Sequence, residues 1–122
     1  MISRAIIEPI RAEYSIESLR EAIANCKKYP NYRVLAVFPN YKEAAMSFVV
    51  FPTEELLGVS VRINHQRQEI NMSCKNGSWI KFLIHGDYTT HGFRVNTLLE
   101  SPLVSKSTLD SVYAPMLIPY RV

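Results

Sequence analysis

The stretch IIEPIRAEYSIESLREAI, residues 6–23, has the pattern of a phosphate-binding loop and its flanking elements: an apolar strand, a short turn, and a serine at the start of a helix. A phosphate-binding loop also needs glycines, whose backbone N–H groups wrap the phosphates, and a lysine that reaches the outer phosphate oxygens. The first glycine of this chain is Gly58 and the first lysine is Lys27, so neither requirement is met here. We therefore expect Ser15 to be the N-cap of a helix.

The charges around this turn are also unfavourable for a nucleotide. Glu13 places a carboxylate where a polyphosphate would lie, and two like charges about 4 Å apart near a protein surface repel by roughly 4 kcal/mol. Arg11 offsets this repulsion only in part. Arg11 and Ser15 are nevertheless the two side chains that would contact a nucleotide bound at this turn.

The histidines and cysteines do not form a metal-binding pattern. His65, His85 and His91 lie far apart, with no pair at the spacing of zinc ligands. Cys26 and Cys74 each stand alone, outside any Cys-x-x-Cys motif, so we expect two buried free thiols in a reducing compartment. The order of serines, histidines and acids does not suggest a catalytic triad. We predict no metal site and no metal cofactor.

Two regions could take part in binding. Arg62 and Arg67 lie in RINHQRQ, residues 62–68, the most basic and polar stretch, and could contact phosphates near a hairpin turn. Trp79 follows an Asn-Gly turn and is either an anchor at the edge of the core or an exposed interaction residue. The alternative for the two arginines is a solvated hairpin end, and both interpretations stay open.

The composition is that of one ordinary globular domain, spanning residues 1–122. Of the residues 48% are hydrophobic and 20% charged, and the formal net charge is +3. No run of Lys or Arg exceeds two residues, so DNA is compatible as a partner without being indicated. Neither a signal peptide nor an apolar segment of membrane-spanning length is evident. We expect a cytoplasmic protein that does not associate with membranes.

Hydrophobic periodicity and capping signals place the elements along the chain. Besides Ser15, Asn40 and Ser107 are the expected N-caps, and Asn76-Gly77 predicts a hairpin with a type I′ turn, whose two central residues have positive φ. The predicted strands cover residues 5–10, 33–39, 59–64, 68–74, 79–84 and 94–100, and the predicted helices cover residues 16–29, 40–51 and 107–116. The tail from Ile118 is either a strand or an ordered end.

This order favours an α/β fold. Strands alternate with helices in the first half, and a buried apolar run such as RVLAVFP, residues 33–39, is typical of a parallel sheet. The alternating runs of the second half add an antiparallel hairpin. We predict a layered, mixed and mainly parallel sheet with an inserted β-hairpin.

Residues 76–117 resemble the centre of the ATPase domain of phage large terminases, the DNA-packaging motors. That family has an NGS-x-I-x-F hairpin, a loop ending in Arg-Gly, an R-x-N-x-L-L strand that leads into the acidic Walker B pair, and a helix with a proline near its end. The matching positions here are Gly77, Ser78, Ile80 and Phe82 in the hairpin, and Arg94, Asn96, Leu98 and Leu99 in the strand. His91-Gly92 stands where the family has Arg-Gly. The resemblance implies part of a P-loop NTPase core, with the turn before Ser15 at the Walker A position.

The chain departs from this family where the chemistry lies. The Walker A glycines and lysine are absent, and Ser15 matches the Mg²⁺-binding hydroxyl in position only. Metal binding and water activation in this class take adjacent carboxylates at a strand end, whereas LLESP offers Glu100 alone, followed by Ser101 and Pro102. Glu100 is the one catalytic candidate, and a solvated loop carboxylate is the alternative.

The resemblance and the departures together predict a terminase-like module that acts by binding. It would bind a packaging component, such as a terminase subunit or the portal, and modulate or inhibit genome packaging without a cofactor. Two alternatives stay open. One is a split or minimal ATP-binding subunit that uses Mg-ATP with residues borrowed from another chain; the other is a small α/β nucleic-acid-binding protein.

Overall fold

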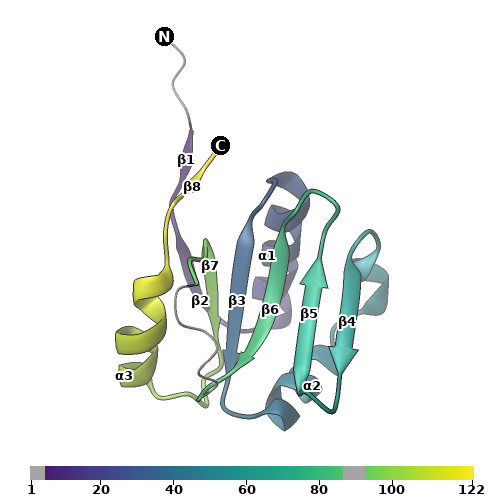
Figure 1. Cartoon of the computed structure of the whole chain (residues 1–122), viewed down its shortest axis with the longest axis vertical. Coiled ribbons are helices and arrows are strands. Elements are labelled where there is room, and N and C mark those ends of the chain that lie inside the picture. The colour runs from purple at the N-terminus through teal and green to yellow at the C-terminus, as the bar shows by residue number, and fades with distance from the viewer. Residues whose placement is uncertain (1–4, 87–92) are drawn as a thin grey trace.

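The computed structural model describes residues 5–86 and 93–122, which form an α/β fold with one large sheet and one small sheet (Figure 1). The large sheet has the strand order β2-β7-β3-β6-β5-β4. Its strands are β2 (Ile10–Glu13), β7 (Thr97–Glu100), β3 (Arg33–Phe38), β6 (Trp79–Ile84), β5 (Glu69–Ser73) and β4 (Ser60–Asn64). The first four run parallel, and β5 and β4 are antiparallel additions. The predicted mixed and mainly parallel sheet is confirmed.

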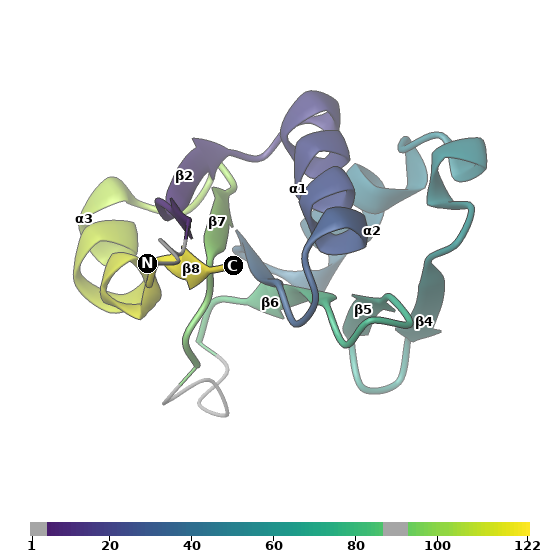
Figure 2. The same ribbon diagram turned by 90° about the horizontal axis from the view of Figure 1, so that it is seen from above.

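The small sheet and the helices complete the fold. β1 (Ile6–Ile7) pairs antiparallel with β8 (Tyr120–Arg121), so the described ends of the chain lie together (Figure 1). The helices are α1 (Ile16–Lys28), α2 (Tyr41–Val49) and α3 (Lys106–Thr108). α3 continues through a wide, π-helical turn, Leu109–Tyr113, and then a 3-10 turn, Ala114–Met116. Another 3-10 turn spans Thr53–Leu56. In Figure 2, α1 and α2 lie on one side of the sheet, and α3 lies beside its β2–β7 end.

The sheet separates two hydrophobic cores. Alternate residues of a strand point to opposite faces, so Val34 and Ala36 of β3 pack beneath α1 and α2, while Leu35 and Val37 pack toward α3. The larger core also contains Leu19, Ala22, Ile23, Cys26, Ala44, Ile70, Met72, Ile80 and Phe82, and the smaller contains Leu83, Val95, Leu98, Leu109, Tyr113 and Met116. Burial of β3 on both faces explains its continuous apolar sequence.

The N-terminal strand differs from its prediction. The sequence predicts one strand over residues 5–10 followed by a turn, but the chain divides around Pro9 between β1 and β2, which belong to different sheets. Proline has no backbone N–H to donate to a strand ladder, so a division there is expected. As a result Arg11 and Glu13 lie on β2 rather than in a turn, and Glu13 is in register with Glu100 of β7.

The hairpin between β5 and β6 is confirmed, but the predicted type I′ turn is wrong. Of its two expected central residues, only Gly77 has a positive φ, at 89°. The Gly77 N–H donates to the carbonyl oxygen of Cys74 at 3.2 Å, and the Cys74 N–H donates to that of Ser78 at 2.9 Å. The connection is therefore one residue wider than a two-residue turn and ends in a left-handed glycine, as three-residue hairpin loops do.

The strand β7 begins later than predicted, and the last helix, α3, begins earlier. β7 begins at Thr97 rather than at residue 94, because Val95 instead bridges to Leu117 near the end of the chain. α3 begins at Lys106, and its N-cap is Ser105 rather than Ser107: the Ser105 Oγ accepts a hydrogen bond from the Thr108 N–H at 3.3 Å. The open question about the tail is answered, because Tyr120 and Arg121 form β8.

Candidate functional site

The carboxyl ends of β2 and β7 meet where the sequence predicts a damaged nucleotide site, and an arginine occupies this position. The Arg11 Nε donates to Glu100 Oε2 at 2.8 Å, and the Arg11 Nη2 donates to Asp110 Oδ1 of the wide turn after α3. Both carboxylates raise the pKa of Arg11, with the hydrogen bond to Asp110 contributing most. Glu100, the catalytic candidate, is therefore an ion-pair partner of the chain's own arginine.

The turn between β2 and α1 is too short for a phosphate-binding loop. Only Tyr14 separates β2 from the N-cap, and its N–H donates to the carbonyl oxygen of Glu100 at 2.8 Å, which continues the strand ladder. Its ring packs edge-on against Phe38, with 4.9 Å between ring centroids. Ser15 is the N-cap, as expected: it exchanges hydrogen bonds with Ser18 at 3.0 and 2.8 Å.

A polar hollow of about 590 Å³ nevertheless lies at this end of the sheet. Its charged lining residues are Arg11, Glu13, Glu100 and Lys106. Lys106 was not singled out by the sequence, because it lies in a helix that follows the sheet rather than in the predicted loop. Two carboxylates beside two cations make a nearly neutral hollow, so the site has little net attraction for a polyphosphate.

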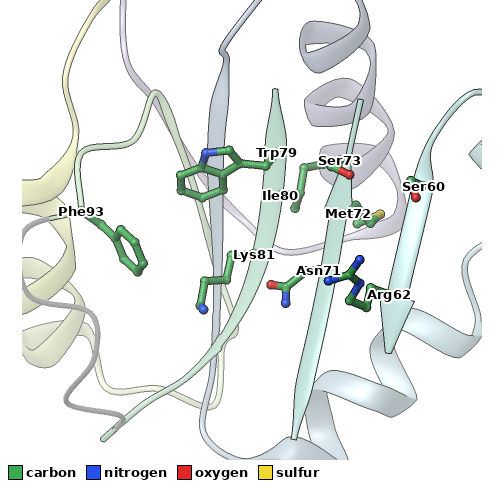
Figure 3. A pocket seen from close by; sticks show the side chains of 9 residues that line it. All are labelled: Ser60, Arg62, Asn71, Met72, Ser73, Trp79, Ile80, Lys81 and Phe93. Atoms are coloured by element: carbon green, nitrogen blue, oxygen red, sulfur yellow. The ribbon is translucent and has the colours of Figure 1, made fainter. Parts of the chain in front are cut away.

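A second hollow, of about 440 Å³, lies on the face of β6, β5 and β4 that points away from α1 and α2 (Figure 3). Cross-strand register builds it from two rows of side chains. One row is Lys81, Asn71 and Arg62, and the other is Trp79, Ser73 and Ser60. In Figure 3 these side chains project from three neighbouring strands toward one space, and Phe93 stands at its side.

Aromatic and cationic groups lie together in this hollow. The ring centroids of Trp79 and Phe93 are 5.9 Å apart, and the Lys81 Nζ lies 5.7 Å from the Phe93 centroid. Trp79, Phe93 and Lys81 are half-buried, whereas Arg62 is exposed. The rings contact the smaller core from its edge, so their position is fixed while one side remains open to solvent.

The structure thus brings together two of the three predicted interaction residues. Trp79 and Arg62 line the same hollow, but Arg67 lies in the β4–β5 turn, where its N–H donates to Asn64 Oδ1 at 3.1 Å, and does not line it. The residues missed from the sequence are Lys81, Asn71 and Phe93. For Lys81 and Asn71 the signal was present, because the alternation along β5 and β6 places them on the face of Trp79.

The remaining chemical candidates have structural partners. His65 Nδ1 lies 2.7 Å from the Tyr41 hydroxyl, His85 Nδ1 lies 2.8 Å from the Tyr113 hydroxyl, and His91 falls outside the described residues. Among residues 5–86 and 93–122, no group of three or more His, Cys, Asp or Glu side chains could hold a metal ion. In the same ranges no helix has the length and apolar character needed to cross a membrane.

The cysteines are both free thiols. Cys26 is buried and Cys74 is partly buried. Burial raises the pKa of the Cys26 thiol to about 12, with a smaller contribution from the nearby Cys74. A thiol with so high a pKa is a poor nucleophile at neutral pH.

Two side chains that carry the terminase resemblance stabilise the fold. Ser78 is fully buried; its Oγ donates to the Tyr29 carbonyl oxygen at 2.6 Å and accepts from the Tyr32 N–H at 2.9 Å. The buried Asn96 accepts from the Arg33 N–H at 3.0 Å and donates to the Ile118 carbonyl oxygen at 3.2 Å. These motif positions join strands to neighbouring segments.

Comparison with known proteins gives no relative from which a function could be transferred. No protein family matches the sequence, and no curated protein or solved structure shows significant similarity to the chain. The function is therefore argued from the geometry of the sheet and of the hollows on its surface.

Proposed function

We propose that the chain is a non-catalytic, terminase-like binding module that modulates or inhibits viral genome packaging. The observation that carries this proposal is the engagement of Arg11 with both Glu100 and Asp110 at the ends of the parallel strands. A motor of the P-loop class needs free carboxylates there for Mg²⁺ and water, and a glycine-rich loop for phosphate. Here a cation of the chain itself pairs with the carboxylate, and a single tyrosine replaces the loop.

The arrangement of strands supports a scaffold of the terminase ATPase type. β2, at the Walker A position, lies parallel and adjacent to β7, at the Walker B position, and both end at the same edge of the sheet. In open α/β sheets this edge is where ligands bind. We propose a likeness of framework alone, because Glu100, the catalytic candidate, already pairs with Arg11.

An apolar surface supports a protein partner. Met46 and Val49 of α2 are 54% and 75% exposed, and Leu57 is 83% exposed. Met46 and Val49 line a hollow of about 470 Å³, together with Ile63 of β4. β4 is the last strand of the sheet, so its outer edge offers unpaired backbone groups to another chain. We propose a packaging component, such as a terminase subunit or the portal, as this partner, in the cytoplasm of an infected cell.

The experiment is co-purification of the tagged chain from infected cells that produce it, with packaging proteins identified by mass spectrometry. We expect retention of a terminase subunit or the portal, equal with and without Mg-ATP. The paired substitution M46E/V49E should abolish retention, whereas Val112→Glu, which changes an exposed apolar residue near α3, should preserve it. Absence of every packaging protein from the retained fraction would refute the proposal.

A split ATP-binding subunit is the second candidate, favoured by the hollow of about 590 Å³ that contains Arg11 and Lys106. In that case another chain would supply the phosphate-binding loop and displace Arg11 from Glu100. Glu100→Gln would then abolish ATPase activity of the assembled complex, whereas a binding module would leave any such activity unchanged.

A further inference from the structure

We infer that the open face of β6, β5 and β4 binds single-stranded nucleic acid, with a base on Trp79 and phosphates on Arg62 and Lys81. This inference goes beyond the proposed function and does not depend on it. Phage packaging proteins are not needed for the binding, and the carboxyl end of the sheet takes no part in it.

The face is available because the third helix covers only part of the sheet. α3 and the turns after it pack over β7, β3 and the part of β6 that carries Leu83. Among the described residues, no helix lies over β5 and β4 on this side; only the turn that joins these two strands is seen there (Figure 2). A polar sheet face needs no ligand, because water can solvate it. The inference therefore depends on which side chains line this face.

The cations have the position that a phosphate backbone requires. Arg62 and Lys81 lie in one cross-strand row, on either side of Asn71. Their Cα atoms are two strand spacings apart, about 10 Å, which lets two phosphates of one strand be neutralised at once. Neither side chain forms an ion pair with a described residue. Within the described strands β4, β5 and β6 the acidic residue of this face is Glu69, which lies one row beyond, opposite Asn64.

The aromatic groups favour nucleic acid over other anions. Trp79 occupies the neighbouring row, and Phe93 supports it with its ring 5.9 Å away. Bases stack on such rings in sheet-face binding proteins, and stacking does not depend on sequence because every base has a π-face. An acidic peptide would satisfy Arg62 and Lys81 but would leave the rings without a planar partner.

The dimensions indicate a single strand and a short contact. The hollow of about 440 Å³ has the volume of a small-molecule pocket, which fits about one or two unstacked nucleotides. A duplex keeps its bases stacked and paired, so it could not place one on Trp79. Asn71, between the two cations, carries a donor and an acceptor that can contact a base edge.

The test is binding of fluorescein-labelled oligo(dT)15 to the purified chain, followed by anisotropy between 20 and 200 mM NaCl. Two phosphate contacts on a single strand give a slope of log K against log salt of about −1.4. Arg62→Ala and Lys81→Ala should each reduce the slope by about 0.7. Trp79→Ala should weaken binding about 5- to 150-fold, the equivalent of one lost base stack. Lys42→Ala, which removes one positive charge from α2 on the other side of the sheet, should change nothing.

A second readout uses the protein's own fluorescence. Trp79 is the single tryptophan of the chain, so stacking of a base on it should quench the intrinsic emission. Melting curves of each variant show whether it is folded. Arg62 is exposed and Lys81 is half-buried, so we expect both charge variants to fold. If Trp79→Ala does not fold, these two variants still test the inference.

Three results would overturn the inference. The first is no binding at 20 mM NaCl. The second is equal competition by duplex DNA or by polyglutamate, which would reassign the face to duplexes or to acidic chains. The third is equal loss of affinity in Lys42→Ala and Lys81→Ala, which would indicate non-specific attraction to net charge. None of these results bears on the co-purification experiment, so the two proposals fail separately.

Discussion

Substitution of Ser78 by alanine should cost more stability than its size suggests. The Ser78 side chain has no solvent exposure and makes hydrogen bonds of 2.6 and 2.9 Å with the Tyr29 carbonyl oxygen and the Tyr32 N–H. Alanine has no hydroxyl, so the Tyr29 carbonyl oxygen and the Tyr32 N–H would both lose this hydrogen-bond partner. The buried Tyr32 N–H left unsatisfied costs about 1–3 kcal/mol, and the lost hydrogen bond to the part-buried Tyr29 carbonyl costs about 1 kcal/mol, so we expect the free energy of unfolding to fall by about 2–4 kcal/mol.

Thermal unfolding followed by circular dichroism measures this loss. A domain of this length has an unfolding entropy near 60 °C of about 0.26 kcal/mol/K, so the melting midpoint should fall by about 8–15 °C. Ser73→Ala is the matched control, because Ser73 is exposed at the end of β5, and it should shift the midpoint by no more than about 2 °C. If Ser78→Ala melts as the control does, the structural explanation of this motif position is refuted.

Three further predictions concern the backbone, an ion pair and the thiols. Gly77→Ala should destabilise, because its φ is +89° and a Cβ would lie 2.2 Å from the Asn31 Oδ1; an unchanged urea midpoint would contradict this. The hydrogen bond from Arg20 lowers the pKa of Glu55, so the stabilising effect of Glu55 is present above pH 4.5 and is lost as the pH falls below it. The difference in unfolding free energy between wild type and Glu55→Gln should therefore shrink from pH 7 to pH 3. A difference that grows toward pH 3 would contradict this prediction. Iodoacetamide at pH 8 should label Cys74 in the native protein and spare Cys26, as peptide mapping would show; rapid labelling of Cys26 would contradict its burial.

The fold class was predictable because local signals and tertiary packing agree. The apolar run of β3 fits a strand buried on both faces, and the N-cap residues Ser15 and Asn40 start α1 and α2 where expected. The division of the first strand was not predictable to the residue. Whether residues after Pro9 continue as a strand depends on pairing with β7, which lies more than 80 residues away in the chain.

The candidate sites could be predicted only in part for the same reason. The absence of a phosphate-binding loop follows from residue types alone, but the pairing of Arg11 with Glu100 and Asp110 requires three distant segments to meet. Trp79 and Arg62 were identified singly, and only the strand order places them in one hollow. Phe93 carries no local signal, since it precedes a strand and reaches the hollow through the packing of the smaller core.

The most direct test of the central claim, that the chain works by binding and without nucleotide, is thermal unfolding with and without 5 mM Mg-ATP. A ligand at 100 times its dissociation constant adds about 2.7 kcal/mol, which here raises the melting midpoint by about 10 °C. Mg-tripolyphosphate controls for non-specific binding of polyanions. The account predicts the same midpoint in all three samples. A rise of about 5 °C or more with Mg-ATP alone would show that the hollow beside Arg11 and Glu100 still binds nucleotide, and would contradict it.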